Sequence, residues 1–181
     1  TLHSALIGIK DVSVIQTPPN GRVPVITTVT ESNDAVIGNA VSRELERGGQ
    51  VLIIYNRVES IYEYLAYIRS IVGNDVSIDI AHGQMDEKTL EKAIFKLYNG
   101  DTQILISTTL IENGVDLPRA NTLIVNNADM LGLSQLYQLK GRIGRSDRQA
   151  YAIFMYDKGR MLSEEAYKRL GAIVEYSGLG N

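Results

Sequence analysis

Six short runs of apolar and β-branched residues, alternating with segments of helical character, constrain the fold of this chain most strongly. Three of the runs are almost continuously apolar, as expected of strands that helices cover on both faces. Alternation of strands with helices requires crossover connections, which join parallel strands. We therefore predict an α/β fold, with a mainly parallel sheet of about six strands and helices on both faces. The expected strands are 23–29, 51–56, 76–82, 103–108, 122–127 and 151–157.

The segments between these runs carry the signals of amphipathic helices. Segment 32–49 begins with cap-type residues and ends in two glycines, as helices commonly do. The next two segments repeat apolar residues every three or four positions, which places those residues on one face of a helix. A further helix is expected from near Ser134, and a last one in 163–180, where Ser163 precedes two glutamates.

The ends of the chain differ from its middle. Residues 1–10 are predicted to form a short helix whose apolar side chains have no obvious partner, and 17–24, with three prolines, an extended linker. The compact domain is expected to begin near Arg22. Because the sequence does not start with Met, it is expected to be a piece of a longer protein.

Composition excludes several classes of protein. No apolar run approaches the roughly 20 residues of a membrane span, and the first residues lack the basic leader of a signal peptide. There are no cysteines and two histidines, which leaves no disulfide framework, thiolate site or histidine metal cluster. A cytosolic setting, no membrane partner and no bound structural metal are therefore expected.

The sequence also lacks the motifs of a complete nucleotide-binding or hydrolytic enzyme. It contains no G-x-x-x-x-G-K-[ST] phosphate-binding loop, no G-x-G-x-x-G and no G-x-S-x-G. The formal net charge of −3 argues against a uniformly basic polyanion binder. Segment 138–160 differs, with six cations against two carboxylates, although such a run is often only a solvated face.

Polar residues and glycines follow four consecutive predicted strands. Because ligands of parallel sheets bind beyond the carboxyl ends of the strands, this edge of the sheet is the expected binding edge. The four segments are "YNRVES" (55–60), "AHGQM" (81–85), "STTLIENGVDLP" (107–118) and "NNADM" (126–130).

The stretch "QLKGRIGR" (138–145) combines two arginines with two glycines. If 134–145 is one helix, the side chains of Gln135, Gln138, Arg142 and Arg145 share a face. Guanidinium groups suit phosphate oxygens, and the glycines permit close approach at the expense of helix stability. The stretch therefore favours contact with phosphates that approach from outside the domain.

The same stretch resembles motif VI of the superfamily 2 helicases and translocases. "ILISTTLIENGVDLP" resembles motif V, "VLIIYNRVES" motif IV, and "AHGQM" the motif between them. The resemblance implies a RecA-like fold and the second of two motor lobes, because in that family the first lobe carries the phosphate-binding loop. It also implies ATP with Mg²⁺, bound mainly by the absent first lobe, so that this chain alone is expected to be inactive.

Over roughly residues 1–178 the chain resembles the bacterial transcription-repair coupling factors, double-stranded DNA translocases that push stalled RNA polymerase off lesions. This implies the end of the first lobe and a linker in 1–21, the C-terminal RecA-like lobe in 22–160, and the start of a translocation helical hairpin in 161–181. The implied partners are the double-stranded DNA backbone, the first lobe of the same protein and, through other regions, RNA polymerase and nucleotide-excision-repair proteins. The implied location is the bacterial cytosol, at the nucleoid.

The resemblance assigns roles to particular residues. Arg142 and Arg145 match arginine fingers, for which surface arginines paired with Asp147 or Asp116 are the alternative. The residues matching nucleotide contacts are Gly114, Asp116 and Gln138, although the first two also suit a simple turn and Gln138 also suits a plain helix-surface glutamine. The residues matching DNA-backbone contacts are Asn56, Arg57, His82, Gly83, Thr108 and Thr109, and a hydrogen-bonded structural role stays open for His82. We assign Tyr55, Tyr62, Tyr64 and Tyr67 to packing, because a duplex offers no splayed bases for stacking.

Two other functions stay open. One is a fork-remodelling lobe of the RecG type, a related family. The other is a non-catalytic α/β module whose arginines only dock nucleic acid or protein.

Overall fold

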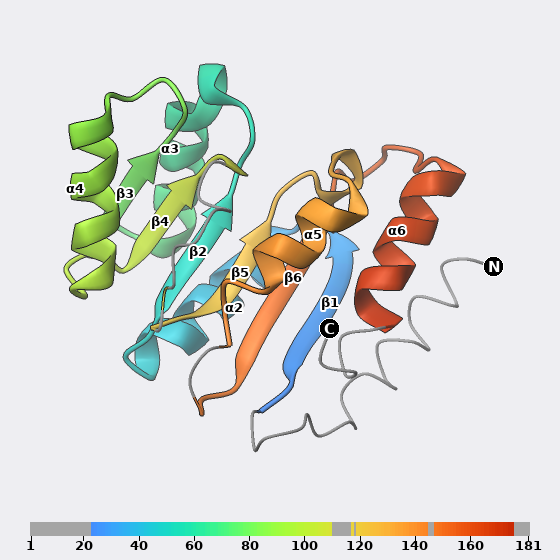
Figure 1. The fold of residues 1–181 in the computed structure, drawn as a ribbon, viewed down its shortest axis with the longest axis horizontal. Helices are drawn as coiled ribbons and strands as arrows, with labels where there is room; N and C mark the ends of the chain where they lie inside the picture. The colour runs from blue at the N-terminus through green and yellow to red at the C-terminus, as the bar shows by residue number, and fades with distance from the viewer. Residues whose placement is uncertain (1–22, 110–116, 118, 145–146, 176–181) are drawn as a thin grey trace.

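The computed structural model describes residues 23–109, 117, 119–144 and 147–175 (Figure 1). Its core is a six-stranded sheet in the order β1-β6-β5-β2-β4-β3, in which every strand pairing is parallel. Each of the six predicted runs overlaps a strand, and the predicted α/β fold is confirmed. The strands are β1 (Val25–Glu31), β2 (Gln50–Ile54), β3 (Ile78–Ala81), β4 (Ile104–Ser107), β5 (Ala120–Val125) and β6 (Ala150–Tyr156).

Helices cover both faces of the sheet. Figure 1 shows α2 and α3 on the far face and α5 on the near face. Short 3₁₀ turns, η2 (Val58–Ser60) and η4 (Ala128–Met130), follow the ends of β2 and β5. The helices are α2 (Asp34–Glu46), α3 (Ile61–Val72), α4 (Glu87–Tyr98), α5 (Leu133–Lys140) and α6 (Glu164–Glu175).

The alternation of side chains along the strands creates two hydrophobic cores. On β2, Val51 and Ile53 pack with α2 and α3, whereas Leu52 and Ile54 pack with α4, α5 and α6. All four side chains are fully buried, which explains why this run is continuously apolar. Because helices cover both faces of the strands, polar residues that bind ligands are expected at the carboxyl ends of the strands.

A buried carboxylate fixes α2 to the sheet. Glu44 is fully buried, and its oxygens accept hydrogen bonds from Arg47 Nε at 2.6 Å and Arg47 Nη2 at 2.7 Å. The Thr122 hydroxyl on β5 donates to Glu44 Oε1 at 2.5 Å. The hydrogen bond to Glu44 raises the pKa of Arg47 above its ordinary value. A charged group so deeply buried is tolerated because each oxygen is satisfied.

The predicted helix 1–10, the linker 17–24 up to residue 22, and the end of 161–181 from residue 176 lie outside the described residues. Within the described ranges, no helix is long and apolar enough to cross a membrane.

Candidate functional site

The carboxyl ends of β2, β4 and β3 lie side by side. Ile54 and Ser107 are register partners, and Ser107 also pairs with Ala81. Hydrogen bonds continue the alignment past the strands, since Thr108 N donates to Ala81 O at 3.1 Å. The segments that follow the three strands therefore meet at one edge, as the sequence pattern predicted.

Asn56 and Thr109 form the direct contact between two of these segments. The Asn56 Oδ1 atom accepts hydrogen bonds from Thr109 N at 3.3 Å and from Thr109 Oγ1 at 3.2 Å. The contact is exposed to solvent. The side-chain oxygen of Asn56 is thus held in place by Thr109.

Thr108 and His82 lie at the same edge but face inward. Thr108 is 6% exposed, and its carbonyl accepts a hydrogen bond from the Ser107 hydroxyl at 2.8 Å. His82 is 9% exposed, and its Nδ1 accepts the Gln84 N–H at 3.2 Å. This geometry favours the structural role for His82 that the sequence left open.

Arg57 and Gly83 are exposed at the same edge. Arg57 precedes η2 in an extended conformation, with φ −135° and ψ 101°. A Cβ atom added to Gly83 would meet nothing within 4 Å, so the space beside this glycine is open to a ligand. We define the group of Asn56, Arg57, His82, Gly83, Thr108 and Thr109 as the strand-end rim.

The predicted helix 134–145 is shorter in the structure. Helix α5 ends at Lys140, so Arg142 lies in the following turn and does not share a helix face with Gln138. Gln135 turns back along the chain, because its Oε1 accepts the Gly132 N–H at 3.1 Å. Gln138 remains exposed near the end of the helix. The expected single face of two amides and two guanidiniums is therefore wrong.

Arg142 lies in the turn that follows α5, and it has no carboxylate partner among the described residues. Its backbone N–H donates to Leu139 O at 3.1 Å, which fixes the turn. Its Nε atom is buried and has no hydrogen-bond acceptor in the described ranges. Among the described residues no ion pair joins Asp147 to Arg142. The other proposed partner, Asp116, lies outside the described residues together with Arg145 and Gly114.

Gly144 closes this turn in a conformation that favours glycine. Its φ is +75°, and an added Cβ would lie 3.0 Å from Val25 Cγ2 on β1. The backbone angle therefore favours glycine here, and the nearby strand leaves little room for a side chain. The turn from Gly141 to Gly144, which we name the Arg142 turn, is packed against the sheet.

Sequence reasoning missed the burial of Lys140. This side chain is 5% exposed, its Nζ has no hydrogen-bond partner in the described part of the chain, and desolvation lowers its pKa to about 8. The sequence did indicate this burial, because Lys140 lies four residues after Leu136 and three before Ile143, on the apolar face of the helix. The cations of 138–160 therefore do not form one exposed patch.

Arg160 belongs instead to a network at the end of β5. Its Nη2 donates to Asn127 Oδ1 at 2.9 Å and Asp129 Oδ1 at 3.0 Å. Arg169 on α6 donates to the carbonyls of Leu131 at 2.9 Å and Asp129 at 2.8 Å. This network attaches α6 to the carboxyl edge of the sheet, a relationship that no spacing in the sequence indicated.

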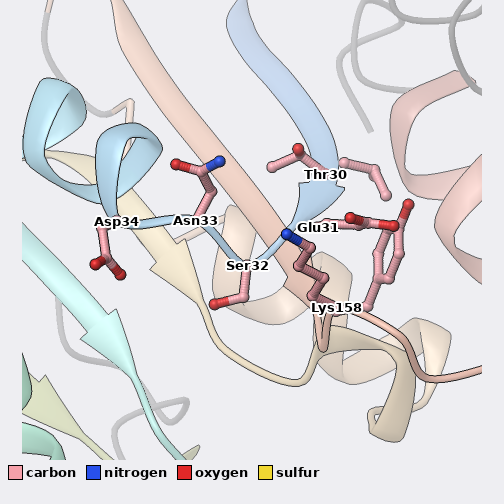
Figure 2. Close-up of a pocket in the computed structure, with 8 residues that line it drawn as sticks. Thr30, Glu31, Ser32, Asn33, Asp34 and Lys158 are labelled. Atoms are coloured by element: carbon pink, nitrogen blue, oxygen red, sulfur yellow. The ribbon is translucent and has the colours of Figure 1, made fainter.

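An open pocket of about 770 Å³ lies at the ends of β1 and β6, beside the start of α2 (Figure 2). Figure 2 shows hydroxyl, amide and carboxylate side chains around it, with Lys158 as its amine. The carboxylates of Glu31 and Asp34 would repel the phosphates of a nucleotide. The pocket includes none of the predicted site residues, and its charge does not favour it as a phosphate site.

In the described ranges no group of three or more histidine or acidic side chains is arranged to hold a metal ion. The chemistry of the described site is that of hydrogen-bond donors for anions: an arginine beyond α5 and amide, hydroxyl and guanidinium groups at the strand-end rim.

Comparison with protein families matches residues 33–147 to the helicase conserved C-terminal domain. The whole chain is 50% identical to the transcription-repair-coupling factor of Staphylococcus haemolyticus strain JCSC1435 and 51% identical to that of Bacillus subtilis strain 168. These matches confirm the resemblance predicted from the motifs. The chain spans 15% of the length of each relative.

The fold is also similar to solved structures. A structure of RecG bound to a three-way DNA junction matches with a TM-score of 0.74 and 31% identity, over 86% of this chain and 21% of RecG. The C-terminal domain of the DEAD-box protein Dbp5 matches with a TM-score of 0.59 and 18% identity, over 84% and 85% of the two chains. The second match concerns the fold alone, and the expected RecA-like helicase C-terminal fold is confirmed.

Proposed function

Because the chain belongs to the helicase conserved C-terminal domain family, we propose that it is the second motor lobe of an ATP-dependent double-stranded DNA translocase of the transcription-repair coupling type. The observation that carries the proposal is Arg142, which follows α5 directly and has a buried Nε without an acceptor in the described ranges. A buried donor without an acceptor is unfavourable, so an anion supplied from outside the lobe would stabilise this arrangement.

Arg142 and Arg145 would contact the γ-phosphate of ATP and stabilise its charge in the transition state. Gln138 and, in motif V, Gly114 and Asp116 are the proposed further nucleotide contacts. ATP with Mg²⁺ would be held mainly by the first lobe, since the phosphate-binding loop is not in this sequence. An arginine finger typically contributes roughly 10³–10⁵ in rate.

The strand-end rim is the proposed DNA-backbone contact. Asn56, Arg57 and Thr109 are exposed or half-buried and offer amide, guanidinium and hydroxyl donors to phosphate oxygens. Thr108 and His82 would support the rim from inside, and Gly83 would allow close approach. Contacts to phosphates alone predict binding that is independent of sequence and weakened by salt.

For the parent protein we propose displacement of stalled RNA polymerase and coupling of transcription to DNA repair. The support is similarity over this chain's full length to proteins named transcription-repair-coupling factors. RNA polymerase and repair proteins would bind other regions of the parent. Residues 22–160 would form the lobe, and α6 would begin the helical hairpin that couples the lobe to movement.

The principal alternative within the same class is a fork-remodelling lobe of the RecG type. The chain is 31% identical to the RecG of the solved structure but about 50% identical to transcription-repair-coupling factors, which favours the latter. A non-catalytic docking module is the alternative from another class, and ATP hydrolysis distinguishes it from a motor lobe.

The deciding experiment measures DNA-stimulated ATP hydrolysis by the full-length parent, with nucleotide affinity measured separately. We expect Arg142→Ala to lower the rate by roughly a thousandfold while nucleotide binding is largely kept. Arg142→Lys should restore little, because an ammonium does not reproduce the planar donor geometry of a guanidinium. Arg119→Ala removes an exposed arginine elsewhere and should leave the rate unchanged. An unchanged rate for Arg142→Ala would reject the motor role in favour of a docking module.

A further inference from the structure

Tyr62 behaves differently from the tyrosines around it. Tyr64 is 8% exposed and stacks on Tyr55, with ring centroids 4.2 Å apart. The Tyr67 hydroxyl donates to Asp34 Oδ1. These contacts agree with the packing role predicted for the group, but Tyr62, in the first turn of α3, is 58% exposed. Burial in a core therefore does not account for its large side chain.

The ring of Tyr62 contacts His82 at the strand-end rim. The two ring centroids are 6.1 Å apart and the rings are nearly perpendicular, at 84°. His82 follows β3, the edge strand of the sheet. Because His82 is 9% exposed and its Nδ1 already accepts the Gln84 N–H, Tyr62 presents the more accessible polar group at this position.

The sheet order places the strand ends of the rim in a row. Asn56 follows β2, Thr109 follows the neighbouring strand β4, and His82 follows β3 at the edge. Neighbouring strands lie about 4.8 Å apart, so the row from β2 to β3 extends over about 10 Å. The ring contact with His82 puts Tyr62 beside the edge-strand end of this row.

We propose that Tyr62 is a further DNA-contact residue, whose hydroxyl donates a hydrogen bond to a backbone phosphate oxygen at the outer end of the strand-end rim. This inference rests on the proposed function. The phenol hydroxyl is a hydrogen-bond donor without a formal charge, and the ring contacts His82 without being buried. The contact requires no unstacked base, so it is compatible with duplex DNA, unlike aromatic stacking on single strands.

A charged and a neutral contact leave different signatures. Removing a cation that contacts a phosphate lowers the slope of log affinity against log salt by about one. Removing the hydroxyl of Tyr62 should weaken binding without changing that slope, since no counterion is released by a neutral donor. The salt slope thus separates the proposed hydrogen bond from an indirect effect on Arg57.

The experiment measures binding of the full-length parent to a labelled DNA duplex by fluorescence anisotropy at several salt concentrations. Tyr62→Phe keeps the ring and its contact with His82, and should bind roughly three- to tenfold more weakly, the usual effect of one lost hydrogen bond. Tyr98→Phe is the matched control, because Tyr98 is also 58% exposed but lies at the far end of α4. It should bind as the unmodified protein does.

Asn56→Ala and Arg57→Ala separate failure of this inference from failure of the proposed function. If both weaken binding while Tyr62→Phe does not, the rim binds DNA and the inference about Tyr62 is rejected. If neither weakens binding, the rim itself is not the DNA contact, and both proposals for this edge are rejected. An equal loss in Tyr98→Phe would show an unspecific effect and would also reject the role of Tyr62.

Discussion

Arg160 and Asp129 join two segments that are far apart in the sequence, with Arg160 Nη2 lying 3.0 Å from Asp129 Oδ1. Asp129 is 7% exposed, and its backbone carbonyl also accepts a hydrogen bond from Arg169 of α6. A second contact runs from the Tyr137 hydroxyl on α5 to Ala172 O on α6 at 3.2 Å. Helix α6 is thus attached both to the end of β5 and to the helix that leads into the Arg142 turn.

Asp129→Ala should loosen α6. The substitution leaves Arg160, whose Nε is already buried without an acceptor in the described ranges, without its buried carboxylate partner. We expect the free energy of unfolding of the chain to fall by about 1–3 kcal/mol, and amide hydrogen exchange to accelerate in α6. Asp157→Ala is the control, because Asp157 is half-exposed and lies 3.5 Å from the same arginine. Equal effects of the two variants would contradict the special role of the buried contact.

Glu44→Ala should destabilise the domain more than removal of any exposed carboxylate on α2. It leaves Arg47 and the Thr122 hydroxyl without their shared acceptor, and it opens space inside the domain. Because Arg47 is partly exposed to water, we expect a loss of about 2–3 kcal/mol in urea denaturation, below the range for a fully buried pair. Glu46→Ala, two residues away and exposed, should change stability by less than about 0.5 kcal/mol.

Lys140 should make stability depend on pH in the alkaline range. Its pKa is lowered by desolvation from 10.5 to about 8, so the folded chain releases this proton before the unfolded chain does. Between pH 8 and 10.5 the unfolded state binds more protons, and stability from this group therefore rises with pH. Below pH 8 both states are protonated, and the full penalty of burying the charge remains.

Lys140→Met should remove both the penalty of burying the ammonium group and the rise of stability with pH. We expect it to raise the free energy of unfolding at neutral pH by about 1–3 kcal/mol, since the buried ammonium is replaced by an apolar side chain of similar length. The difference between variant and unmodified chain should shrink as pH rises through the window. Lys92→Met, at an exposed position of α4, should leave the pH profile unchanged. Parallel profiles for Lys140→Met and the unmodified chain would contradict the assignment.

The strands could be predicted from the sequence because their residues are buried on both faces. Their ends were less predictable: β1 begins at Val25 and pairs through Glu31, whereas the expected run was 23–29. Pro24 lacks an N–H group and suits the position before a ladder better than one within it. At the other end, Glu31 pairs with Tyr156, and this tertiary contact has no counterpart in hydrophobic periodicity.

The strand-end rim could be predicted in outline, because parallel strands of similar register bring their ends together. The sequence could not predict which residues of the rim face outward. Thr108 and Thr109 are equivalent in sequence pattern, but Thr108 is 6% exposed and Thr109 is half-buried. The end of α5 was also missed, because glycine is permitted inside a helix as well as after it. The link from Asp129 to α6 depends on residues about 40 positions apart and leaves no local signal.

Gly144→Ala should disturb the Arg142 turn specifically. An alanine at φ +75° is unfavourable by about 1–2 kcal/mol, and its Cβ would meet Val25 Cγ2 at 3.0 Å. Either the strain is retained and the free energy of unfolding falls, or the turn shifts and displaces Arg142 from the position proposed for the γ-phosphate. In the second case we expect DNA-stimulated ATP hydrolysis by the full-length parent to fall at least tenfold with nucleotide affinity nearly unchanged, because a small misplacement of a catalytic group strongly reduces rate.

Gly132→Ala provides the matched control for this variant. Gly132 has a φ of −73°, and an added Cβ would meet only the Gln135 Oε1 atom at 3.9 Å. Alanine is therefore accommodated there with a small loss of N-terminal capping, and both stability and ATP hydrolysis should stay close to those of the unmodified protein. If Gly144→Ala were as harmless as Gly132→Ala in both measurements, the Arg142 turn would not require its left-handed glycine, and its geometry would not be what positions Arg142.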